Sequence, residues 1–323
     1  MTYNPLVSIV IPVYNGTNFM REAIDCALAQ TYKNIEVLVV NDGSTDNGAT
    51  DKVAKSYGNK IRYIYKENGG VSSVLNVAIQ QMRGEWLSWL SHDDLYYPNK
   101  IEKQISFINK LIKETENIDL NKIAIHTATE SIDKDGNVIR VPSFKGIPEK
   151  ENTIDVILDN IYTYRLSGCS FLLPAKCFKD VGGFREDIRT VSDVEFWYRL
   201  LLAGYQFYCM RNDILVKNRS HGKQVGKTKI ALFEKEQNNL FIEIADELAK
   251  LKQYNSLENS EKMYFGLIKR HLYQAADYVM DKYIKNDVSV VALCKIAIKK
   301  NYWNVLGSVR NILRDFYRKR NVK

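Results

Sequence analysis

The sequence predicts an α/β protein with an open, mostly parallel sheet, followed by a mostly α-helical C-terminal region. Two observations predict it. Short apolar runs rich in β-branched residues alternate with segments of helical period through roughly the first hundred residues. From Lys229 onward, helical periodicity takes over, with apolar residues sharing one face. The chain has 323 residues, 45% of them hydrophobic, so two or three substructures with packed cores are expected.

The first three elements are predicted to be strand, helix and strand. Residues 7–13 form a short β-branched run that ends at the turn signal Asn15-Gly16. Apolar residues at helical spacing follow between Phe19 and Leu28, and a second strand is expected over 35–40. Strand, helix and strand in this order make a parallel βαβ unit.

The pattern then repeats, and polar residues follow each strand. Strands are expected at 61–65 and 86–90, with a helix over 74–82 between them. Ligands of open α/β sheets bind outside the carboxyl ends of the strands, so the polar groups there should converge on one crevice. These groups are Tyr14-Asn15, Asn41-Asp42 and His92-Asp93-Asp94.

The rest of the chain is predicted to be mixed and then helical. A helix should run from Pro98 to about Leu120, followed by a strand at 123–126 and a helix at 196–202. We therefore expect a domain over 1–227, within which the pattern changes at about residue 98. A helical region should cover 228–323.

Two classes of nucleotide-binding enzyme have little support. The first strand is followed by no Gly-x-Gly-x-x-Gly and no Walker loop, which argues against dinucleotide dehydrogenases and P-loop enzymes. What remains is a set of carboxylates at strand ends. Adjacent acids there suit Mg²⁺ or Mn²⁺, which take one or two carboxylates together with substrate phosphates.

Several blocks in order resemble the family-2 nucleotide-sugar glycosyltransferases of GT-A fold. The resemblance covers roughly residues 5–224 and rests on blocks at 7–15, 39–46, 68–72, 84–98 and 192–193. It implies an inverting, metal-assisted enzyme that moves a hexose or N-acetylhexosamine from a UDP-sugar to a hydroxyl. It also implies that the domain over 1–227 consists of a nucleotide-binding half (1–98) and an acceptor half (99–227). The acceptor would be a glycan, a glycoprotein or a lipid-linked molecule.

The resemblance assigns the nucleoside pocket to the ends of the first two strands. It implies that Pro12, Tyr14 and Asp42 hold the uracil and ribose, with Asn15 and Ser44 supporting them. A carboxylate can accept the uracil imide N–H, and an aromatic ring can stack on the base. The alternative is an ordinary turn, for which Asn41-Asp42-Gly43 is a good sequence.

The glycine pair and the following helix contain one departure from the family. Gly69 should let the backbone pass close to the donor, and Asn76 matches a family position near the donor site. The family usually has an Arg where this chain has Leu75. A diphosphate contact from that Arg must come from elsewhere or be absent, and Leu75 and Asn76 otherwise only begin a helix.

The family's Asp-x-Asp motif aligns with Ser91-His92-Asp93, so its first acid is missing. The resemblance implies that Asp93 bridges Mn²⁺ or Mg²⁺ to the donor phosphates, within a donor-binding segment that includes His92. Asp94 should brace this loop or bind an outer-sphere water, or it caps the next helix. His221 belongs to an Arg-x-His-x-x-Gln pattern and is a candidate second metal ligand. A solvated His is the alternative.

Asp193 is the candidate general base. It resembles the family's Glu-Asp motif, with Ser192 in place of the Glu. One carboxylate suffices to take the proton of the acceptor hydroxyl as that oxygen attacks from the side opposite UDP. A helix cap is the alternative explanation for this Asp.

The C-terminal tail is strongly basic. Residues 295–323 contain nine Lys or Arg and one acid, against a net charge of +8 for the whole chain. A basic amphipathic helix there could lie on an anionic membrane, although packing or self-association into a homo-oligomer is favoured. We expect no nucleic acid partner. The N-terminus lacks a signal-peptide pattern, so a cytoplasmic protein, with peripheral contact at the inner membrane face as an option, is expected.

Two other functional classes stay open. A nucleotidyltransferase also combines such a sheet with metal carboxylates, but it usually has a glycine-rich, basic loop after its first strand. A non-catalytic nucleotide-sugar-binding module would explain why Leu75, Ser91 and Ser192 stand where the family prefers charged residues.

Overall fold

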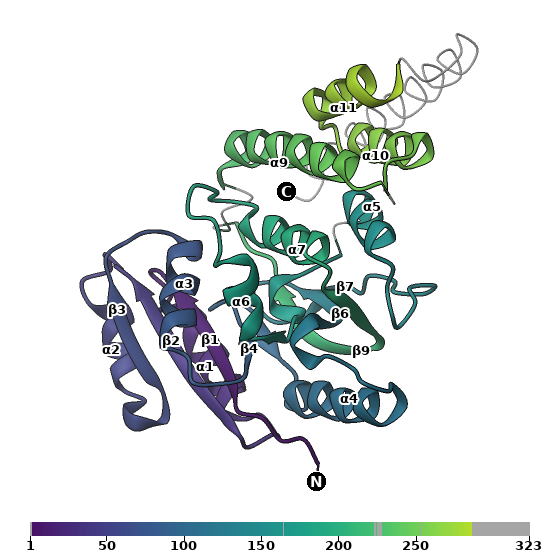
Figure 1. Ribbon diagram of the computed structural model, residues 1–323. Helices are drawn as coiled ribbons and strands as arrows, with labels where there is room; N and C mark the ends of the chain where they lie inside the picture. Colours follow the sequence, from purple (N-terminus) through teal and green to yellow (C-terminus); the bar gives the residue numbers. More distant parts are fainter. Residues whose placement is uncertain (1, 164, 223, 225–227, 253, 286–323) are drawn as a thin grey trace. The chain divides into compact units, whose positions relative to one another are not determined.

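The structure is a computed structural model that describes residues 2–163, 165–222, 224, 228–252 and 254–285 (Figure 1). Its internal contacts divide the chain into two compact units. The first unit comprises residues 1–153 and 165–228, and the second comprises 154–164 and 229–323. The expected boundaries between donor half, acceptor half and helical region stay a prediction.

The first unit contains a five-stranded sheet with the order β3-β2-β1-β4-β8. The first four of these strands are mutually parallel, and β8 runs antiparallel to β4. The strands are β1 (Val7–Val13), β2 (Ile35–Asp42), β3 (Arg62–Lys66), β4 (Trp86–Trp89) and β8 (Leu173–Pro174). Every residue of β1 is buried, as expected for a central parallel strand covered on both faces.

The register of this sheet aligns the strand ends. Val13 at the end of β1 pairs with Asn41 near the end of β2, and Asp42 pairs with Lys66 at the end of β3. The loops that follow these strands therefore begin at one edge of the sheet. The crossover helices are α1 (Met20–Leu28), α2 (Ala49–Lys55) and α3 (Val71–Gln81), with a short turn, η1 (Gly58–Lys60), before β3.

A second sheet, with the order β5-β9-β6-β7, completes the first unit. Its strands are β5 (Leu95–Tyr96), β6 (Ile123–Ile132), β7 (Val138–Arg140) and β9 (Gln206–Arg219). Strands β6 and β9 are parallel and stay paired as far as Ile132 and Arg219. Strand β6 is therefore longer than the strand predicted at 123–126. Strand β9 was not predicted, because buried and exposed residues do not alternate regularly along it.

Helices and short turns connect the two sheets. They are α4 (Lys100–Glu114), η2 (Leu120–Lys122), η3 (Gly168–Ser170), α6 (Lys176–Val181) and α7 (Ser192–Leu202). Helix α7 begins four residues before the expected start at Phe196. The main core includes Ile11 of β1, Val39 of β2, Ile24 of α1 and Ile108 of α4, all fully buried.

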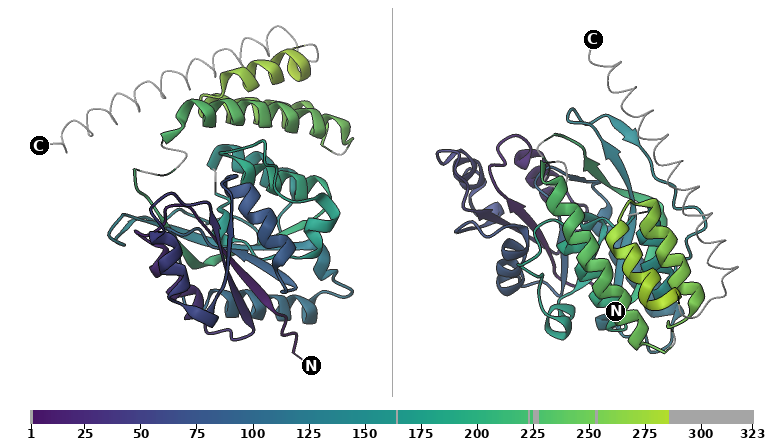
Figure 2. Two further views of the ribbon diagram at one scale, coloured as in Figure 1. Left: turned by 90° about the vertical axis from the view of Figure 1, so that its left-hand side faces the viewer. Right: turned by 90° about the horizontal axis from the view of Figure 1, so that it is seen from above.

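The second unit is helical. Its described residues form α5 (Thr153–Thr163), α9 (Ile230–Lys250), α10 (Leu257–Lys269), α11 (Tyr273–Val279) and a π-helical turn, η4 (Met280–Ile284). Helices α9, α10 and α11 lie side by side (Figure 2). The apolar face expected on α9 is buried at Leu240, Phe241, Ile244 and Leu248.

Gly266 lets α10 approach α5 closely, because a Cβ atom there would lie 2.7 Å from Cγ2 of Ile161. No helix among the described residues is long and apolar enough to span a membrane. The basic tail, with its predicted membrane or subunit contact, lies outside the described residues.

Candidate active site

Asp93 and His221 meet at the edge of the first sheet. Asp93 lies in the turn after β4, and His221 lies two residues beyond the end of β9. The Oδ2 atom of Asp93 is 2.9 Å from Nε2 of His221, and the two side chains are only 13% and 14% exposed. The fold thus brings together the two residues predicted as metal ligands, although 128 positions separate them in the chain.

Arg219 fixes the loop that carries Asp93. Its buried guanidinium donates to the Asp93 carbonyl at 2.8 Å, to the Lys134 carbonyl at 2.8 Å and to Oε2 of Glu22 at 2.7 Å. It also lies over the ring of Phe19, 4.4 Å from the ring centroid. Arg219 therefore ties β4, β9 and α1 together around the Asp93–His221 pair.

Asp94 points into the protein. Its Oδ1 accepts a hydrogen bond from the backbone N–H of Arg219 at 2.7 Å, and its Oδ2 accepts one from Cys169 Sγ at 3.2 Å. Burial raises the pKa of Asp94 to about 8, and the charge of Asp93 acts in the same direction. The contacts brace the loop, whereas Asn99 occupies the N-cap position of α4.

His92 connects the ends of β1 and β4. Its ring lies against Gly16, where an added Cβ would approach its Cδ2 to 2.9 Å. Burial lowers the pKa of His92, which favours a neutral ring. A donor contact from His92 stays a prediction.

Asp42, at the end of β2, is bound by the end of β3 and by the loop that follows β3. Its Oδ1 accepts from Lys66 Nζ at 2.9 Å and from the Gly69 N–H at 2.8 Å; its Oδ2 accepts from the Gly70 N–H at 2.7 Å and from Asn68 Nδ2 at 3.2 Å. A carboxylate offers about four acceptor positions, so these donors occupy them all. The predicted bond to a uracil imide would require one of them to move.

The loops after β1 and β2 are joined beside Asp42. The Asn15 N–H donates to Ser44 Oγ at 2.9 Å, and the Thr45 N–H donates to Oδ1 of Asn15 at 2.8 Å. Asn15 adopts a φ of +48°, in the left-handed region. Pro12 is buried in β1, whereas Tyr14 is 45% exposed and presents a ring on which a base could stack.

Asp193 is the second residue of α7 and is half-buried. Its Oδ1 accepts a hydrogen bond from the Val194 N–H at 2.8 Å, and Val191 occupies the N-cap position. Burial raises the pKa of Asp193 to about 6. A carboxylate with this pKa can accept a proton near neutral pH.

Comparison with known proteins identifies the family. Residues 8–116 match the profile of Glycosyl transferase family 2. An uncharacterized glycosyltransferase of Rickettsia typhi is 45% identical over 233 residues, which is 72% of this chain and 70% of that protein. The chain belongs to glycosyltransferase family 2.

Two further comparisons describe the extent and the fold of this glycosyltransferase. An uncharacterized glycosyltransferase of Rickettsia conorii is 40% identical over 96% of this chain, but the chain spans only 50% of that relative. The complex of S. aureus TarS 1–349 with UDP-GlcNAc superposes with a TM-score of 0.64 at 18% identity, covering 91% of this chain and 79% of TarS. The predicted α/β GT-A fold with a helical C-terminal part is confirmed.

Two of the three departures of this glycosyltransferase from its family lie at buried positions, and the third, Ser91, is half-buried. Leu75 is fully buried in α3, and Ser192 is 3% exposed. Ser91 donates its N–H to Cys169 Sγ at 3.3 Å. Apolar or small polar residues suit these positions, because a charged side chain there would need a buried partner.

Asn76 joins α3 to the segment before α7. Its Nδ2 donates to the Phe184 carbonyl and to Oε1 of Glu186, both at 2.9 Å, and its Oδ1 accepts from the Phe184 N–H at 2.8 Å. Gly69 lies beside Lys66 and Ser73, where a Cβ would be 2.9 Å from Nζ and 2.6 Å from Oγ. Direct donor contacts from Asn76 and Gly69 stay predictions.

Sequence reasoning missed three residues at this site. Lys66 holds Asp42, Cys169 contacts Asp94, and Arg189 donates to the Gly69 carbonyl. Lys66 directly follows the strand predicted at 61–65 and ends the observed β3, so the strand register could have indicated it. Cys169 and Arg189 reach partners at least 75 residues away, and no local pattern signals such contacts.

Proposed function

We propose that this chain is a metal-assisted, inverting transferase that moves a hexose or N-acetylhexosamine from a UDP-sugar to an acceptor hydroxyl. The observation that carries the proposal is the Asp93–His221 pair at the sheet edge, 2.9 Å apart and held in place by Arg219. Its position beyond the carboxyl end of β4 is where ligands of open α/β sheets bind.

The donor atoms of this pair fit a divalent cation. A carboxylate oxygen and an imidazole nitrogen suit Mn²⁺, and the oxygen suits Mg²⁺. Within the part of the chain that the structure describes, no group of three or more His, Cys, Asp or Glu could hold a metal. Asp93 and His221 would therefore hold it together with phosphate oxygens of the donor. A bound cation would neutralise charge on the departing UDP.

The nucleoside end supports a uridine donor. The exposed Tyr14 ring lies beside the joined loops of Asn15 and Ser44, next to Asp42. TarS, which shares the fold, has been solved with UDP-GlcNAc. We therefore assign the nucleotide to this edge, with Tyr14 stacking on the base and Asp42 shaping the pocket.

Asp193 supplies the base. It takes the proton of the acceptor hydroxyl while that oxygen bonds to the anomeric carbon. The bond from that carbon to UDP breaks on the opposite face, UDP leaves with the electron pair, and the configuration inverts. The pKa of about 6 leaves Asp193 mostly ionised at neutral pH, as this step needs.

The acceptor is a hydroxyl of a glycan, a glycoprotein or a lipid-linked molecule, in a cytoplasmic reaction that builds a surface or protein glycan. The amphipathic tail would serve self-association or contact with the inner membrane face. Both assignments rest on sequence reasoning.

UDP release tests the proposal directly. The chain is incubated with UDP-glucose, UDP-galactose and their N-acetyl forms, with and without Mn²⁺. We expect Mn²⁺-dependent UDP release from at least one donor. Once an acceptor is found, Asp193→Asn should lower transfer by about 100-fold or more. Full transfer by this variant would show that Asp193 is not the base.

The same assay separates an enzyme from a non-catalytic module. The substitutions at Leu75, Ser91 and Ser192 favour a module, since each removes a charge the family prefers. A module would bind UDP-sugars and release no UDP from any of the four.

A further inference from the structure

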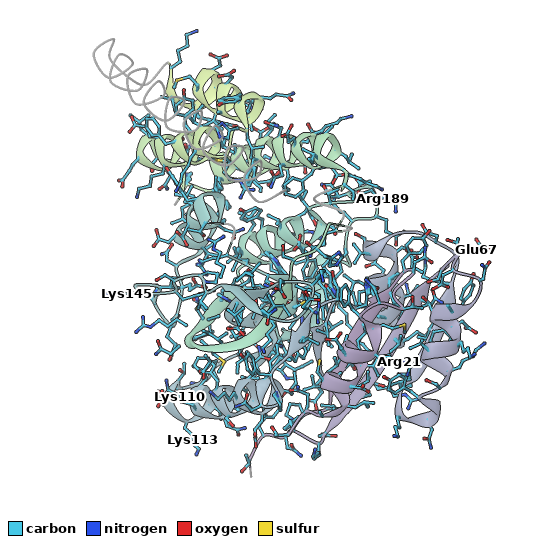
Figure 3. All side chains as sticks on the ribbon, turned by 180° about the vertical axis from the view of Figure 1, so that it is seen from behind. Arg21, Glu67, Lys110, Lys113, Lys145 and Arg189 are labelled. Atoms are coloured by element: carbon cyan, nitrogen blue, oxygen red, sulfur yellow. The ribbon has the colours of Figure 1, made fainter. Side chains whose placement is uncertain are left out.

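Lys100, the first residue of α4, is fully buried. Figure 3 shows the more usual behaviour of Lys110 and Lys113 on the same helix, which point outward. In the part of the chain that the structure describes, the Lys100 amine contacts no carboxylate. Burial lowers its pKa to about 7, because the charged amine is removed from water. A cation buried without a counter-charge is costly, so its contacts should show what it does there.

The Lys100 amine belongs to a buried hydrogen-bond network behind β4. Its Nζ atom donates to Ser88 Oγ and to Gln104 Oε1, both at 2.9 Å, and a longer contact of 3.5 Å reaches the Phe171 carbonyl. The same atom lies 4.2 Å from the centroid of the Tyr96 ring. An ammonium group has three N–H donors, so each of them has an acceptor here.

The hydrogen bonds of this network run in one direction, from Lys100 to the last residue of β4. The Tyr96 hydroxyl donates to the Trp89 carbonyl at 2.5 Å, so its single proton is used there. Tyr96 Oη, which is 2.8 Å from Ser88 Oγ, therefore accepts from Ser88. Ser88 in turn accepts from Lys100. A donor at Lys100 thus favours the arrangement in which Tyr96 donates to Trp89.

The bond between Tyr96 and Trp89 closes the base of the loop that carries Asp93. This loop comprises residues 90–94, between β4 and β5. Trp89 directly precedes it, and Tyr96 lies two residues beyond its end. Because the Tyr96 hydroxyl reaches back to the Trp89 carbonyl, the two ends of the loop are held together.

The same amine supports the loop through η3. Gln104, which accepts from Lys100, donates from Nε2 to the Ser170 carbonyl at 3.0 Å. Cys169, the neighbouring residue in η3, donates from Sγ to Oδ2 of Asp94 at 3.2 Å. Lys100 is therefore connected both to the base of the loop and to the residue beside the metal ligand.

We propose that Lys100 is a positioning residue for Asp93, and that its amine holds the loop 90–94 in the conformation that binds a divalent cation. Because the amine is fully buried, it acts on the cation only through this loop. A neutral side chain of similar length would leave Ser88 and Gln104 without this donor and would let the loop open. This inference rests on the proposed function, because it concerns the cation that Asp93 would hold.

Hydrogen exchange of the full chain tests the effect on the loop, without metal or donor. Lys100→Met keeps the apolar stem and removes the donors, whereas Tyr96→Phe removes only the hydroxyl. Lys103→Met is the matched control, since Lys103 lies three residues further along α4 and pairs with Asp213 instead. Peptides that cover residues 90–94 should exchange about fivefold faster or more in the first two variants, and at the normal rate in the control.

Calorimetry tests the effect on the cation. The affinity for UDP is measured in Mn²⁺ buffer and in EDTA, and the ratio of the two gives the gain that Mn²⁺ provides. This gain should fall about fivefold or more in Lys100→Met and Tyr96→Phe, and it should be unchanged in Lys103→Met. Uridine binding should stay within about twofold in all variants, because the loops after β1 and β2 lie outside the network.

Two results would overturn the assignment while the proposed function stands. One is normal exchange of the loop 90–94 in Lys100→Met. The other is a gain from Mn²⁺ that is unchanged although the unfolding temperature falls, which would mean that Lys100 only stabilises the fold. If Lys100→Met does not fold, Tyr96→Phe decides by the same comparisons. An unchanged chain that gains no UDP affinity from Mn²⁺ would overturn the metal-assisted function itself, and the assignment with it.

Discussion

Asp42 and Asp93 look alike in sequence, since each follows a buried strand of the same parallel sheet. Their surroundings differ. Asp42 is 6% exposed and accepts hydrogen bonds from Lys66, Asn68 and the N–H groups of two glycines. Asp93 is 13% exposed and faces the imidazole of His221. A strand-end acid therefore marks the ligand edge of a sheet, but its local donors decide whether the carboxylate organises a loop or binds a ligand.

Asp93→Asn should give the largest effect. The substitution keeps the size of the side chain but removes the charge that would hold a divalent cation. We expect Mn²⁺-dependent UDP release to fall by about 100-fold or more, with little change in the unfolding temperature. Initial rates at saturating Mn²⁺ measure it, and thermal unfolding checks the fold.

Asp94→Asn is the matched control for Asp93→Asn. An amide oxygen at position 94 can still accept the Arg219 N–H, now bonded at 2.7 Å, so the brace survives in part. Activity should fall much less than for Asp93→Asn. Equal losses would show that the adjacent pair acts as a unit and that Asp93 has no separate role.

Asp42→Asn should act mainly on stability, whereas Asp93→Asn should act mainly on activity. An amide would replace one acceptor oxygen with an NH2 group, which would face the N–H donors of Asn68 and Gly70, and would leave Lys66 without its counter-charge. We expect the free energy of unfolding to fall by about 2 kcal/mol. Urea unfolding measures this change.

Asp187→Asn provides the comparison for Asp42→Asn. Its side chain is 67% exposed and pairs with Arg185 at the surface. Removing such a pair should cost less than about 1 kcal/mol. If Asp42→Asn cost no more than this control, the loop contacts of Asp42 would not stabilise the fold.

Much of the fold could be predicted from the sequence, because β-branched runs and helical spacing are local signals. The four parallel strands and the strand-end position of Asp42 and Asp93 followed from them. Contacts such as Asp42 with Gly70 or Cys169 with Asp94 could not be predicted, since they depend on how distant loops pack. The sequence could therefore locate the carboxylates, but it could not show that the acceptor positions of Asp42 are filled.

Asp193 is the third carboxylate of the site, and its ionisation should set the pH dependence of transfer. Burial raises its pKa to about 6, and the base must be ionised to accept a proton. The value of kcat/KM should therefore be constant above about pH 7 and fall about tenfold between pH 7 and pH 5. Rates measured from pH 5 to pH 8 test this, and a flat profile would argue against Asp193 as the base.

The smallest effect should come from Asn15, which joins the loops beside Asp42. Its φ of +48° favours Gly over Ala, because a Cβ atom strains the left-handed region. Both Asn15→Gly and Asn15→Ala lose the side-chain bond to the Thr45 N–H. In most positions a glycine variant is less stable than an alanine variant, because glycine loses more backbone entropy on folding. At position 15 we expect the opposite, with Asn15→Ala about 1 kcal/mol less stable than Asn15→Gly, because of the positive φ. Urea unfolding of the two variants measures the difference. If Asn15→Gly were the less stable variant, the loop after β1 would relax around alanine. The loop that carries Asn15 would then be held less firmly than the loop that carries Asp93.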